Sequence, residues 1–394
     1  MRISILTLGS RGDVQPYLAL AIGLKRAGYS VRLASHAIFE PLIRSYGIDF
    51  ALVRFNPLDI VNHPDAQRTK TNIVRFMLTV RRIIGPLYLS VFDDFWQACQ
   101  DGEAIIASPT AANAYDCAQA LEVPLFLGLL QPLIPTRQYP SFFLPPFPNI
   151  GGAFNKATHH LFNQLLWQNV RTSVNDWRKI RLGLRPASFF GPYRKLRAQR
   201  VPYLFACSPS IIPKPPDWNA WHHVTGFWFL EPQSDFCPPP ELEDFLNSGA
   251  PPVYIGFGSM AQQQPEKVTE VIVEALARSN QRGILAGGWG WSEQFSLPDT
   301  MLQVEDVPHH WLFPRMAALV HHGGAGTTAA ALRSGMPSIV VPFGGDQPHW
   351  GRVLAEHGVS AGVLPIDDLA AGSLTQALTL ATNDHLLRSR ANSL

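Results

Sequence analysis

The sequence of 394 residues is long enough for two domains, because single cores seldom grow beyond about 250 to 300 residues. Its 32 basic residues nearly balance 30 acidic ones, so no strong field of the whole chain favours nucleic acid or an anionic membrane as a partner. The four cysteines form no CxxC pair, which argues against a disulfide framework or zinc ribbon and favours a reducing, cytoplasmic compartment. No apolar run reaches about 18 residues, so no membrane-spanning helix is expected.

The first part of the chain predicts a strand, loop, helix and strand in succession. Residues 2–8 form the first strand, Gln15–Ala27 the helix and Tyr29–Ser35 the second strand. Such a unit makes a right-handed parallel crossover. Candidate strands at 103–108 and 123–128, with a helical segment between them, continue this doubly wound α/β pattern.

The composition changes after this region. Residues 131–149 are dense in proline and aromatic residues, which favours an ordered loop that presents apolar surface. Helical spacing returns at 154–182, where one apolar stripe is predicted. That stripe consists of Phe154, Ala157, Leu161 and Leu165. Proline-rich residues 216–240 predict a linker between an N-terminal domain, 1–215, and a C-terminal domain, 241–394.

The C-terminal half repeats the α/β pattern. It opens with a strand at 252–260, a helix at 265–279 and a strand at 283–288. A strand at 317–322 and a glycine turn then lead into a helix, and the same order recurs after a strand at 338–343. Two successive α/β domains are therefore the expected architecture.

HHGGAGTT at 321–328 is the strongest local signal for chemistry. Its glycines permit close backbone approach, and Thr327 and Thr328 begin a helix whose N-terminal N–H groups and dipole suit a diphosphate. His322 could donate to the same phosphates as a cation or as a neutral N–H group. The alternative is a tight strand-to-helix turn in which Thr327 is the N-cap.

Two further loops support this site. Ser259, in GFGSM, ends the first strand of the second domain, and ligands gather at the carboxyl ends of strands in a doubly wound sheet. Asp346 and Gln347, in PFGGDQPHWG, pair a carboxylate with an amide, which suits vicinal sugar hydroxyls. The alternatives are a plain strand-to-helix turn for GFGS, and Asp346 as an N-cap with Pro348 in the first helical turn.

GSRGDVQP at 9–16 poses a different question. A glycine turn before a helix suits an anion, but the carboxylate of Asp13 would repel a phosphate. Asp13 therefore either caps the helix or serves something other than a nucleotide. The sequence holds no Asp-x-Asp, no HExxH and no GxSxG pattern, which argues against a metal centre and against a hydrolase triad.

These segments in this order resemble the UDP-sugar-dependent glycosyltransferases of GT-B fold. The likeness is closest to the sterol 3-beta-glucosyltransferases and the bacterial glycopeptide and macrolide glycosyltransferases, and it spans nearly the whole chain except for 131–240. The resemblance implies two doubly wound Rossmann-like domains that face each other across a cleft. The N-terminal domain would hold the acceptor and the C-terminal domain the nucleotide sugar.

The resemblance also implies roles for single residues. Asp13 would be the general base that takes the proton of the acceptor hydroxyl, and Ser10 would help to position the acceptor. The residues for the diphosphate and sugar would be Ser259, His322, Gly324, Gly326, Thr327, Asp346 and Gln347. The implied reaction moves a hexose, expected to be glucose, from a UDP-sugar with inversion of configuration. It needs neither a metal nor a cofactor, because the UDP-sugar is a co-substrate and the helix N-terminus stabilises the leaving diphosphate.

An apolar acceptor, such as a sterol, another lipid or a secondary metabolite, is expected. The aromatic residues proposed to line its pocket, or to lie against a membrane, are Tyr139, Phe142, Phe143, Phe147, Trp167 and Trp177. The alternative is a rigid aromatic loop buried on its own domain. Likewise, the basic run RKLRAQR at 194–200 meets lipid headgroups or is a solvated surface. We expect a monomer with peripheral membrane contact.

Two other functions compete with transfer. A sugar-nucleotide epimerase would need its acid and base inside the donor crevice, and a silent nucleotide-sugar-binding protein would need no base. The chain also departs from the family in two places. Trp311 does not match cleanly the tryptophan on which plant members stack the base, and family chains usually continue beyond RSRANSL with a last helix, so a fragment or a diverged end with weaker domain coupling is expected.

Overall fold

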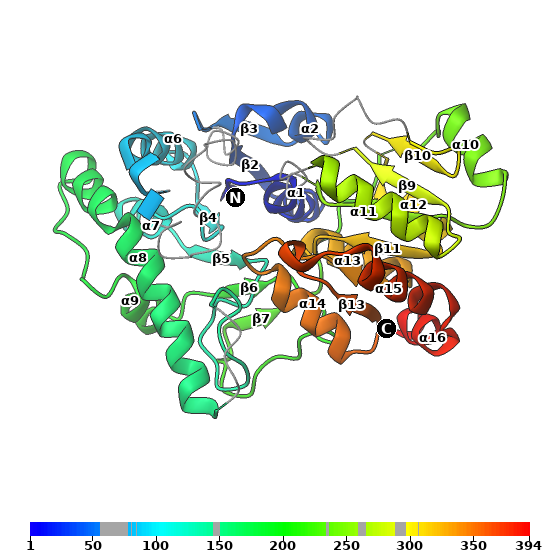
Figure 1. Cartoon of the computed structure of the whole chain (residues 1–394). Helices are drawn as coiled ribbons and strands as arrows, with labels where there is room; N and C mark the ends of the chain where they lie inside the picture. Colours follow the sequence, from blue (N-terminus) through cyan, green and yellow to red (C-terminus); the bar gives the residue numbers. More distant parts are fainter. Residues whose placement is uncertain are drawn as a thin grey trace. The chain divides into compact units, whose positions relative to one another are not determined.

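The computed structural model describes residues 1–55, 78–79, 81–83, 85–144, 150–233, 236–258, 265–287, 297–305 and 307–394. The chain divides into two compact units, Met1–Gln233 and Ser234–Leu394 (Figure 1). The division falls inside the segment that the sequence suggests as a linker, 216–240. Part of that segment nevertheless forms a strand, His222–Val224, which pairs with the first sheet.

The first unit is built on a seven-stranded sheet in which every described pair of neighbours is parallel. The strand order is β3-β2-β1-β4-β5-β6-β7. The sheet is thus extended on one side of β1 by β2 and β3 and on the other side by β4 to β7. The strands are β1 (Arg2–Leu6), β2 (Ser30–Ser35), β3 (Asp49–Leu52), β4 (Ala104–Ala107), β5 (Leu125–Leu129), β6 (Tyr203–Phe205) and β7 (His222–Val224).

Helices cover both faces of this sheet. Ile3 and Ile5 of β1 pack with Val14 and Leu18 of α1 on one face, while Leu6 packs with the core of α6, α7 and α8 on the other. Alternate residues of β1 therefore belong to the two hydrophobic cores on opposite faces of the sheet, as expected in a doubly wound sheet. The helices are α1 (Arg11–Arg26), α2 (Glu40–Ser45), α6 (Tyr88–Cys99), α7 (Ala114–Leu121), α8 (Gly152–Leu182) and α9 (Tyr193–Ala198), with one-turn 3-10 helices η1 (Ala37–Phe39) and η2 (Gly85–Leu87).

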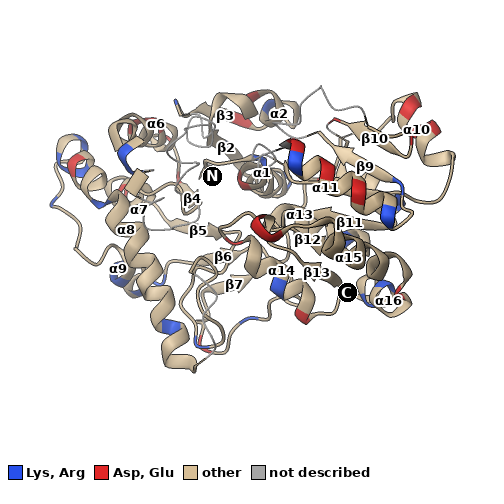
Figure 2. Cartoon of the chain, in the orientation of Figure 1, with Lys and Arg blue, Asp and Glu red and all other residues tan. Residues whose placement is uncertain are grey.

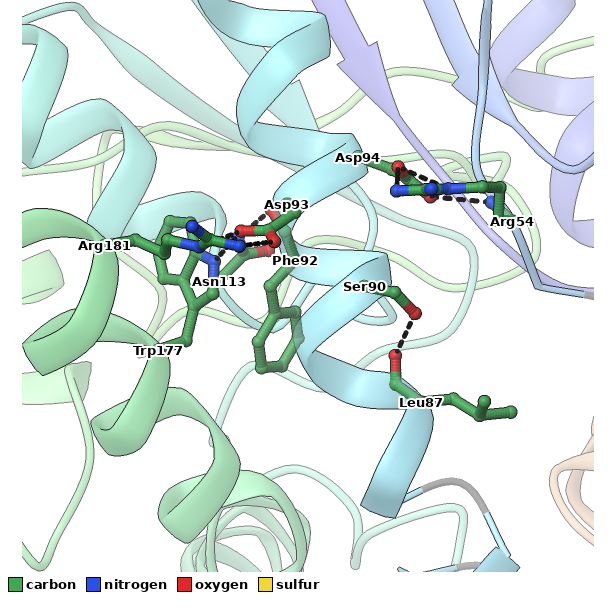
Figure 3. A network of polar contacts seen from close by, with 9 residues as sticks. All are labelled: Arg54, Leu87, Ser90, Phe92, Asp93, Asp94, Asn113, Trp177 and Arg181. Carbon is green, nitrogen blue, oxygen red and sulfur yellow. Dashed lines mark hydrogen bonds and ion pairs between the residues drawn. The ribbon is translucent and has the colours of Figure 1, made fainter.

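A polar network ties α6 to its surroundings (Figure 3). Asp94 accepts from the guanidinium of Arg54, with 2.7 Å between Arg54 Nη2 and Asp94 Oδ1. The neighbouring Asp93 accepts from Trp177 Nε1 at 2.9 Å and from Arg181 Nη2 at 2.6 Å. The adjacent aspartates thus point to different partners, because successive residues of a helix do not share a face.

The second unit repeats the architecture with six parallel strands in the order β10-β9-β8-β11-β12-β13. The strands are β8 (Val253–Gly256), β9 (Gly283–Ala286), β10 (Met301–Val304), β11 (Ala318–His321), β12 (Ser338–Val340) and β13 (Ser360–Val363). The helices are α10 (Pro240–Asn247), α11 (Pro265–Arg278), α12 (His309–Leu312), α13 (Ala325–Ser334), α14 (Gln347–Glu356), α15 (Ala371–Asn383) and α16 (His385–Ser393), with 3-10 helices η4 (Phe313–Arg315) and η5 (Ile366–Asp368).

Its core again lies on both sides of the sheet. Val253 and Ile255 of β8 pack against α11 and α15, while Tyr254 packs with Leu312 and Phe313 near α12. The predicted strands of this half exist but are shorter than expected, and β8 ends at Gly256. The doubly wound α/β fold inferred from the sequence is confirmed for both units.

Two details of the predicted helices differ from the structure. Helix α1 begins at Arg11 instead of Gln15, because Ser10 is the N-cap and Asp13 occupies the third helical position. In α8 the predicted stripe faces the wrong way: Leu161 is 53% exposed, and the buried face includes Phe162, Trp167 and Trp177. Spacing alone did not choose between two apolar stripes on one long helix.

Among the residues that the structure describes, no helix is both long enough and apolar enough to cross a membrane.

Candidate functional sites in the two units

In each sheet, one strand marks the point where the strand order reverses. In the first unit it is β1, flanked by β2 and β4, and in the second it is β8, flanked by β9 and β11. Loops that leave the carboxyl ends of strands at such a point diverge and open a crevice for ligands. The turn with Asp13 follows β1. The histidine-glycine segment, HHGGAGTT at 321–328, follows β11. Both predicted motifs therefore lie at the switch point of their own sheet.

The turn after β1 brings the carboxylate of Asp13 against the backbone of Gly9. Gly9 has a φ of +142°, and a Cβ atom there would lie 2.3 Å from Asp13 Oδ2. No side chain fits at that distance, so the turn requires glycine. The glycine of GSRGD thus makes room for the carboxylate of Asp13.

The carboxylate of Asp13 is half-buried and bound by one residue. Its Oδ2 atom accepts from the backbone N–H of Ser10 at 2.8 Å and from Ser10 Oγ at 2.9 Å. Burial raises the pKa of Asp13 above its ordinary value, and the two bonds from Ser10 oppose this shift because they favour the charged form. Asp13 is not the N-cap of α1, contrary to the alternative reading, because Ser10 occupies that position; Asp13 is the third helical residue and accepts from the N-cap N–H in a capping box. Its raised pKa suits a proton acceptor.

The turn that holds Asp13 is anchored by residues that the sequence analysis did not single out. His36, directly after β2, places its Nε2 atom 2.7 Å from the carbonyl oxygen of Gly9. A carbonyl only accepts, so the ring carries its proton on Nε2, and burial lowers the pKa of His36, which keeps it neutral. Thr110, after β4, bonds both the N–H and the carbonyl of Leu8 at 3.1 Å.

The glycine segment after β11 is compact for steric reasons. Gly323 has a φ of +83°, and a Cβ atom there would lie 2.7 Å from Val340 and 3.0 Å from the carbonyl oxygen of Gln347. His321 is fully buried, and its Nδ1 atom accepts from the N–H of Gly323 at 3.1 Å. The segment is therefore packed between β12 and the start of α14, and its hydrogen bond with the buried ring of His321 holds Gly323 in place.

His322 lies between two loops of the second unit. Its ring occupies the space beside Gly324, where an added Cβ would be 2.4 Å from Nε2, and its Cε1 atom is 3.6 Å from the Cβ position of Gly258. Burial lowers the pKa of His322 to about 4, opposed in part by the carbonyl of Gly256. Of the two forms that the sequence left open, the structure favours the neutral imidazole at neutral pH.

The start of α13 offers backbone donors. Gly324 is the N-cap, and the first helical bond runs from the N–H of Thr328 to the carbonyl of Gly324 at 2.9 Å. The preceding N–H groups, of Ala325, Gly326 and Thr327, therefore have no carbonyl four residues back inside the helix. The alternative in which Thr327 is the N-cap is wrong, since Thr327 is the third helical residue. Donors and dipole at this end suit an anion.

Asp346 and Gln347 lie at the start of α14, next to the glycine segment. Asp346 holds the N-cap position, but its Oδ2 atom accepts from Trp350 Nε1 at 3.0 Å. Gln347 Oε1 accepts from the N–H of Phe343 at 2.7 Å, so the NH2 group of that amide is the part that can donate to a ligand. The structure thus brings His322, Gly324, Gly326, Thr327, Asp346 and Gln347 to one edge of the second sheet.

The aromatic residues expected at the acceptor site are mostly packed inside the first unit. Phe142 is 5% exposed and contacts Tyr139 at 5.3 Å between ring centroids. Phe143 stacks on Phe162 of α8 at 4.8 Å. Trp167 and Trp177, expected to line a pocket or meet a membrane, are 5% and 0% exposed and belong to the core. That expectation for the two tryptophans is wrong, because both lie on the buried face of α8.

Two of the predicted site residues, Ser259 and Phe147, lie outside the residues that the structure describes. Trp311, considered for contact with the base, packs against Phe236 at 5.1 Å, and the guanidinium of Arg315 lies 4.1 Å from its ring centroid. These neighbours within the second unit cover part of the ring, and Trp311 is half-buried.

Family models match both ends of the chain. Residues 3–139 match the glycosyltransferase family 28 N-terminal domain, and residues 288–394 match the C-terminal domain of the erythromycin biosynthesis protein CIII-like family. The first match contains the Asp13 turn, and the second contains the histidine-glycine segment and the start of α14.

Much longer proteins are similar to this chain over nearly all of its length. A sterol 3-beta-glucosyltransferase of Emericella nidulans is 37% identical over 408 residues, which cover 100% of this chain and 28% of that protein. One of Saccharomyces cerevisiae is 35% identical, covering 99% of this chain and 33% of the relative. The chain therefore spans about a third of the length of these relatives.

Solved structures share the fold at low sequence identity. The glycotransferase of kitacinnamycin superposes with a TM-score of 0.67 at 17% identity, covering 100% of this chain and 93% of the other. A spinosyn rhamnosyltransferase complexed with thymidine diphosphate gives 0.64 at 16% identity, covering 100% and 95%.

Proposed function

We propose that the chain is a glycosyltransferase that moves a hexose from a UDP-sugar to a hydroxyl of a lipophilic acceptor. The family 28 match at its N-terminal end, the EryCIII-like match at its C-terminal end and the GT-B fold that it shares with the glycotransferase of kitacinnamycin support this proposal. The relatives named sterol 3-beta-glucosyltransferases support glucose as the sugar and a sterol as the acceptor. The neighbour with thymidine diphosphate supports a nucleoside diphosphate as the leaving group.

One observation carries this proposal: the first sheet presents a carboxylate at its switch point, and the second presents a helix N-terminus that suits a diphosphate. A nucleotide bound at residues 9–13 would meet the charge of Asp13, whereas a hydroxyl there can give its proton to that group. The raised pKa of Asp13 supports the role of base. Ser10 keeps the carboxylate in place by two hydrogen bonds.

In the proposed reaction, the acceptor oxygen attacks the anomeric carbon from the side opposite the diphosphate. The new C–O bond forms as the bond to the phosphate oxygen breaks, the electron pair leaves with UDP, and the acceptor proton passes to Asp13. A single displacement of this kind inverts the configuration. We propose that the N–H groups of Gly326 and Thr327, with His322, stabilise the charge on the leaving diphosphate without a metal ion.

The remaining site residues complete the proposal. Asp346 and Gln347 would bind hydroxyls of the sugar, with the NH2 group of Gln347 as a donor. Ser259 would assist at the phosphates. Phe143, which is half-buried, would form an apolar wall of the acceptor site, which suits a sterol ring system better than a polar acceptor. Phe142 is buried and would contribute to this wall only through its packing on Tyr139.

The test compares wild-type protein with D13N. Transfer of glucose from UDP-glucose to sterols, other lipids and polyketides is measured by mass spectrometry, with dTDP-glucose as the competing donor. D13N should lose activity by about 10² to 10⁴-fold and keep its affinity for UDP-glucose. The matched control, D176N, changes an exposed aspartate of α8 and should behave like the wild type.

Other outcomes would decide against transfer. Conversion of UDP-glucose to its epimer without an acceptor would show an epimerase. Binding of UDP-glucose with neither transfer nor slow hydrolysis would show a silent binding protein. A D13N variant with near-normal turnover would remove the base assignment.

A further inference from the structure

Exposed aromatic side chains gather on one short segment of the first unit. Among the described residues, four Phe, Tyr and Trp side chains are at least 36% exposed, and three of them are Phe189 (54%), Phe190 (65%) and Tyr193 (36%). On α8, Leu161 and Ile180 are also exposed, at 53% and 65%. We call residues 188–197 the aromatic-basic segment.

Hydrogen bonds hold this segment in place. Trp167 Nε1 donates to the carbonyl of Ser188 at 3.1 Å, and Gln168 Nε2 donates to the carbonyl of Phe189 at 2.7 Å. Gly191 has a φ of +78°, and a Cβ atom there would lie 3.1 Å from the ring of Trp167. The turn is thus built onto α8, and the exposure of its two phenylalanines is a property of the folded unit.

The charged residues near these rings in the sequence are almost all basic. Residues 171–200 hold nine of the chain's 32 Lys and Arg residues but only one of its 30 Asp and Glu residues. Two of the nine are used in ion pairs within the unit, Arg178 with Asp116 and Arg181 with Asp93. In Figure 2 the blue of Lys and Arg marks the last turns of α8 and the helix α9. A chain with a net charge of +2 therefore concentrates positive charge here.

We propose that the aromatic-basic segment docks on an anionic lipid bilayer. Phe189 and Phe190 would enter the boundary between headgroups and acyl chains, where aromatic rings are favoured, while Arg194, Lys195 and Arg197 bind the anionic headgroups. An acidic protein would satisfy the charge but would not explain two adjacent exposed phenylalanines held by a rigid turn. A single-stranded nucleic acid could stack its bases on the rings, but the chain's net charge of +2 disfavours it. This inference concerns where the protein binds and goes beyond the proposed transfer reaction.

The experiment measures sedimentation of the full chain with vesicles, without donor or acceptor, so its outcome is independent of transfer activity. The chain should bind phosphatidylcholine vesicles that contain about 30% phosphatidylserine, should bind pure phosphatidylcholine weakly, and should be released by salt. F189A/F190A should weaken binding at least about tenfold. R194Q/K195Q should weaken it about 25-fold, since each basic side chain near an anionic surface contributes about fivefold.

Matched controls separate docking from general surface effects. L380A/L386A removes two exposed leucines of the second unit, 46% and 67% exposed, and R26Q/K267Q removes two exposed basic residues elsewhere. Both should bind like the wild type. F189L/F190L keeps apolar area and should retain most of the binding, even if the alanine pair lowers stability.

The proposal is overturned by any of three results. The first is no sedimentation with phosphatidylserine vesicles. The second is unchanged binding of F189A/F190A or R194Q/K195Q with a melting temperature like that of the wild type. The third is an equal loss of binding in the control pairs.

Discussion

Ser10 donates both its backbone N–H and its hydroxyl to one oxygen of Asp13, at 2.8 and 2.9 Å. Two donors on one carboxylate oxygen stabilise the charged form, while burial favours the neutral form and dominates, so the pKa of Asp13 is raised. Ser10 therefore opposes the effect of burial and increases the charged fraction of Asp13 at a given pH. Its hydroxyl serves this purpose through Asp13, whether or not it also touches an acceptor.

We predict that S10A shifts the acid limb of the pH profile of kcat/KM to higher pH. Removing the hydroxyl removes a bond that lowers the pKa of Asp13, so that pKa rises further and protonation inactivates the base earlier as the pH falls. Activity on the alkaline plateau should remain, because Asp13 is charged there in both proteins. S373A, which removes a comparable hydroxyl near the start of α15, should leave the limb in place. A limb that stays put or moves to lower pH in S10A contradicts the role of Ser10.

A second prediction concerns the backbone of the same turn. In G9A the new Cβ would lie 2.3 Å from Asp13 Oδ2 on a residue with a φ of +142°, so the carboxylate must move and the turn is strained by about 1–3 kcal/mol. We expect kcat to fall at least about tenfold, with the affinity for UDP-glucose unchanged. The control is G23A in the same helix, where an added Cβ meets nothing within 4 Å. G23A should be fully active and slightly more stable. Full activity of G9A would mean that the position of Asp13 does not matter.

The motifs were predictable because each rests on local backbone requirements. Gly9 and Gly323 both have a positive φ, which favours glycine locally, and a side chain at Gly9 would also collide with Asp13 four residues later. Glycines of this kind can be expected from a sequence. His36 and Thr110 could not be found this way. They reach the Asp13 turn only because β2 and β4 flank β1 in the sheet, and strand order is a long-range property. The only signal available was a polar residue soon after each strand, His36 directly after β2 and Thr110 three residues after the end of β4.

The faces of α8 show a second limit. The sequence predicted the helix itself within two residues, but the stripe that begins at Phe154 is partly exposed while Trp167 and Trp177 are buried. A helix of 31 residues with several aromatic residues offers two apolar stripes. Which one is buried depends on α6 and α7, which contribute Phe92 and Cys117 to the same core. The other stripe, which includes Leu161, is left partly exposed on the surface of the first unit.

A third prediction uses the buried state of His322, whose pKa is lowered to about 4. The ring is neutral at pH 7 and would bind the diphosphate as an N–H donor, so H322A should weaken UDP-glucose binding about 10 to 100-fold, as expected for a bond to a charged group. Wild-type affinity should be flat from pH 6 to 8 and rise toward pH 4, because protonation adds a positive charge beside the diphosphate. H385A, at an exposed histidine of α16, should bind normally. A wild-type titration near pH 6.5 would contradict a buried neutral ring.

The last prediction concerns the stability of the first unit. Asp116 of α7 and Arg178 of α8 form an ion pair in which each side chain is only 4% exposed, and Arg178 Nε also donates to the carbonyl of Arg185 at 3.1 Å. D116A leaves a buried guanidinium without its counter-charge, which costs about 3–5 kcal/mol. Unfolding can be followed by tryptophan fluorescence, to which Trp167 and Trp177 of the same core contribute.

The design of this test rests on a double variant. D116A/R178M removes both charges and keeps most of the packing volume, so it should recover part of the stability lost in D116A, because the main penalty is the unpaired charge and not the loss of attraction. D176A, at an exposed aspartate of the same helix as Arg178, should change stability by less than about 0.5 kcal/mol. The ion pair does not stabilise the contact between α7 and α8 if the free energy of unfolding of D116A equals that of the wild type. The same conclusion follows if the double variant is less stable than D116A. In that case the packing of Trp177 and its neighbours alone would hold the two helices together.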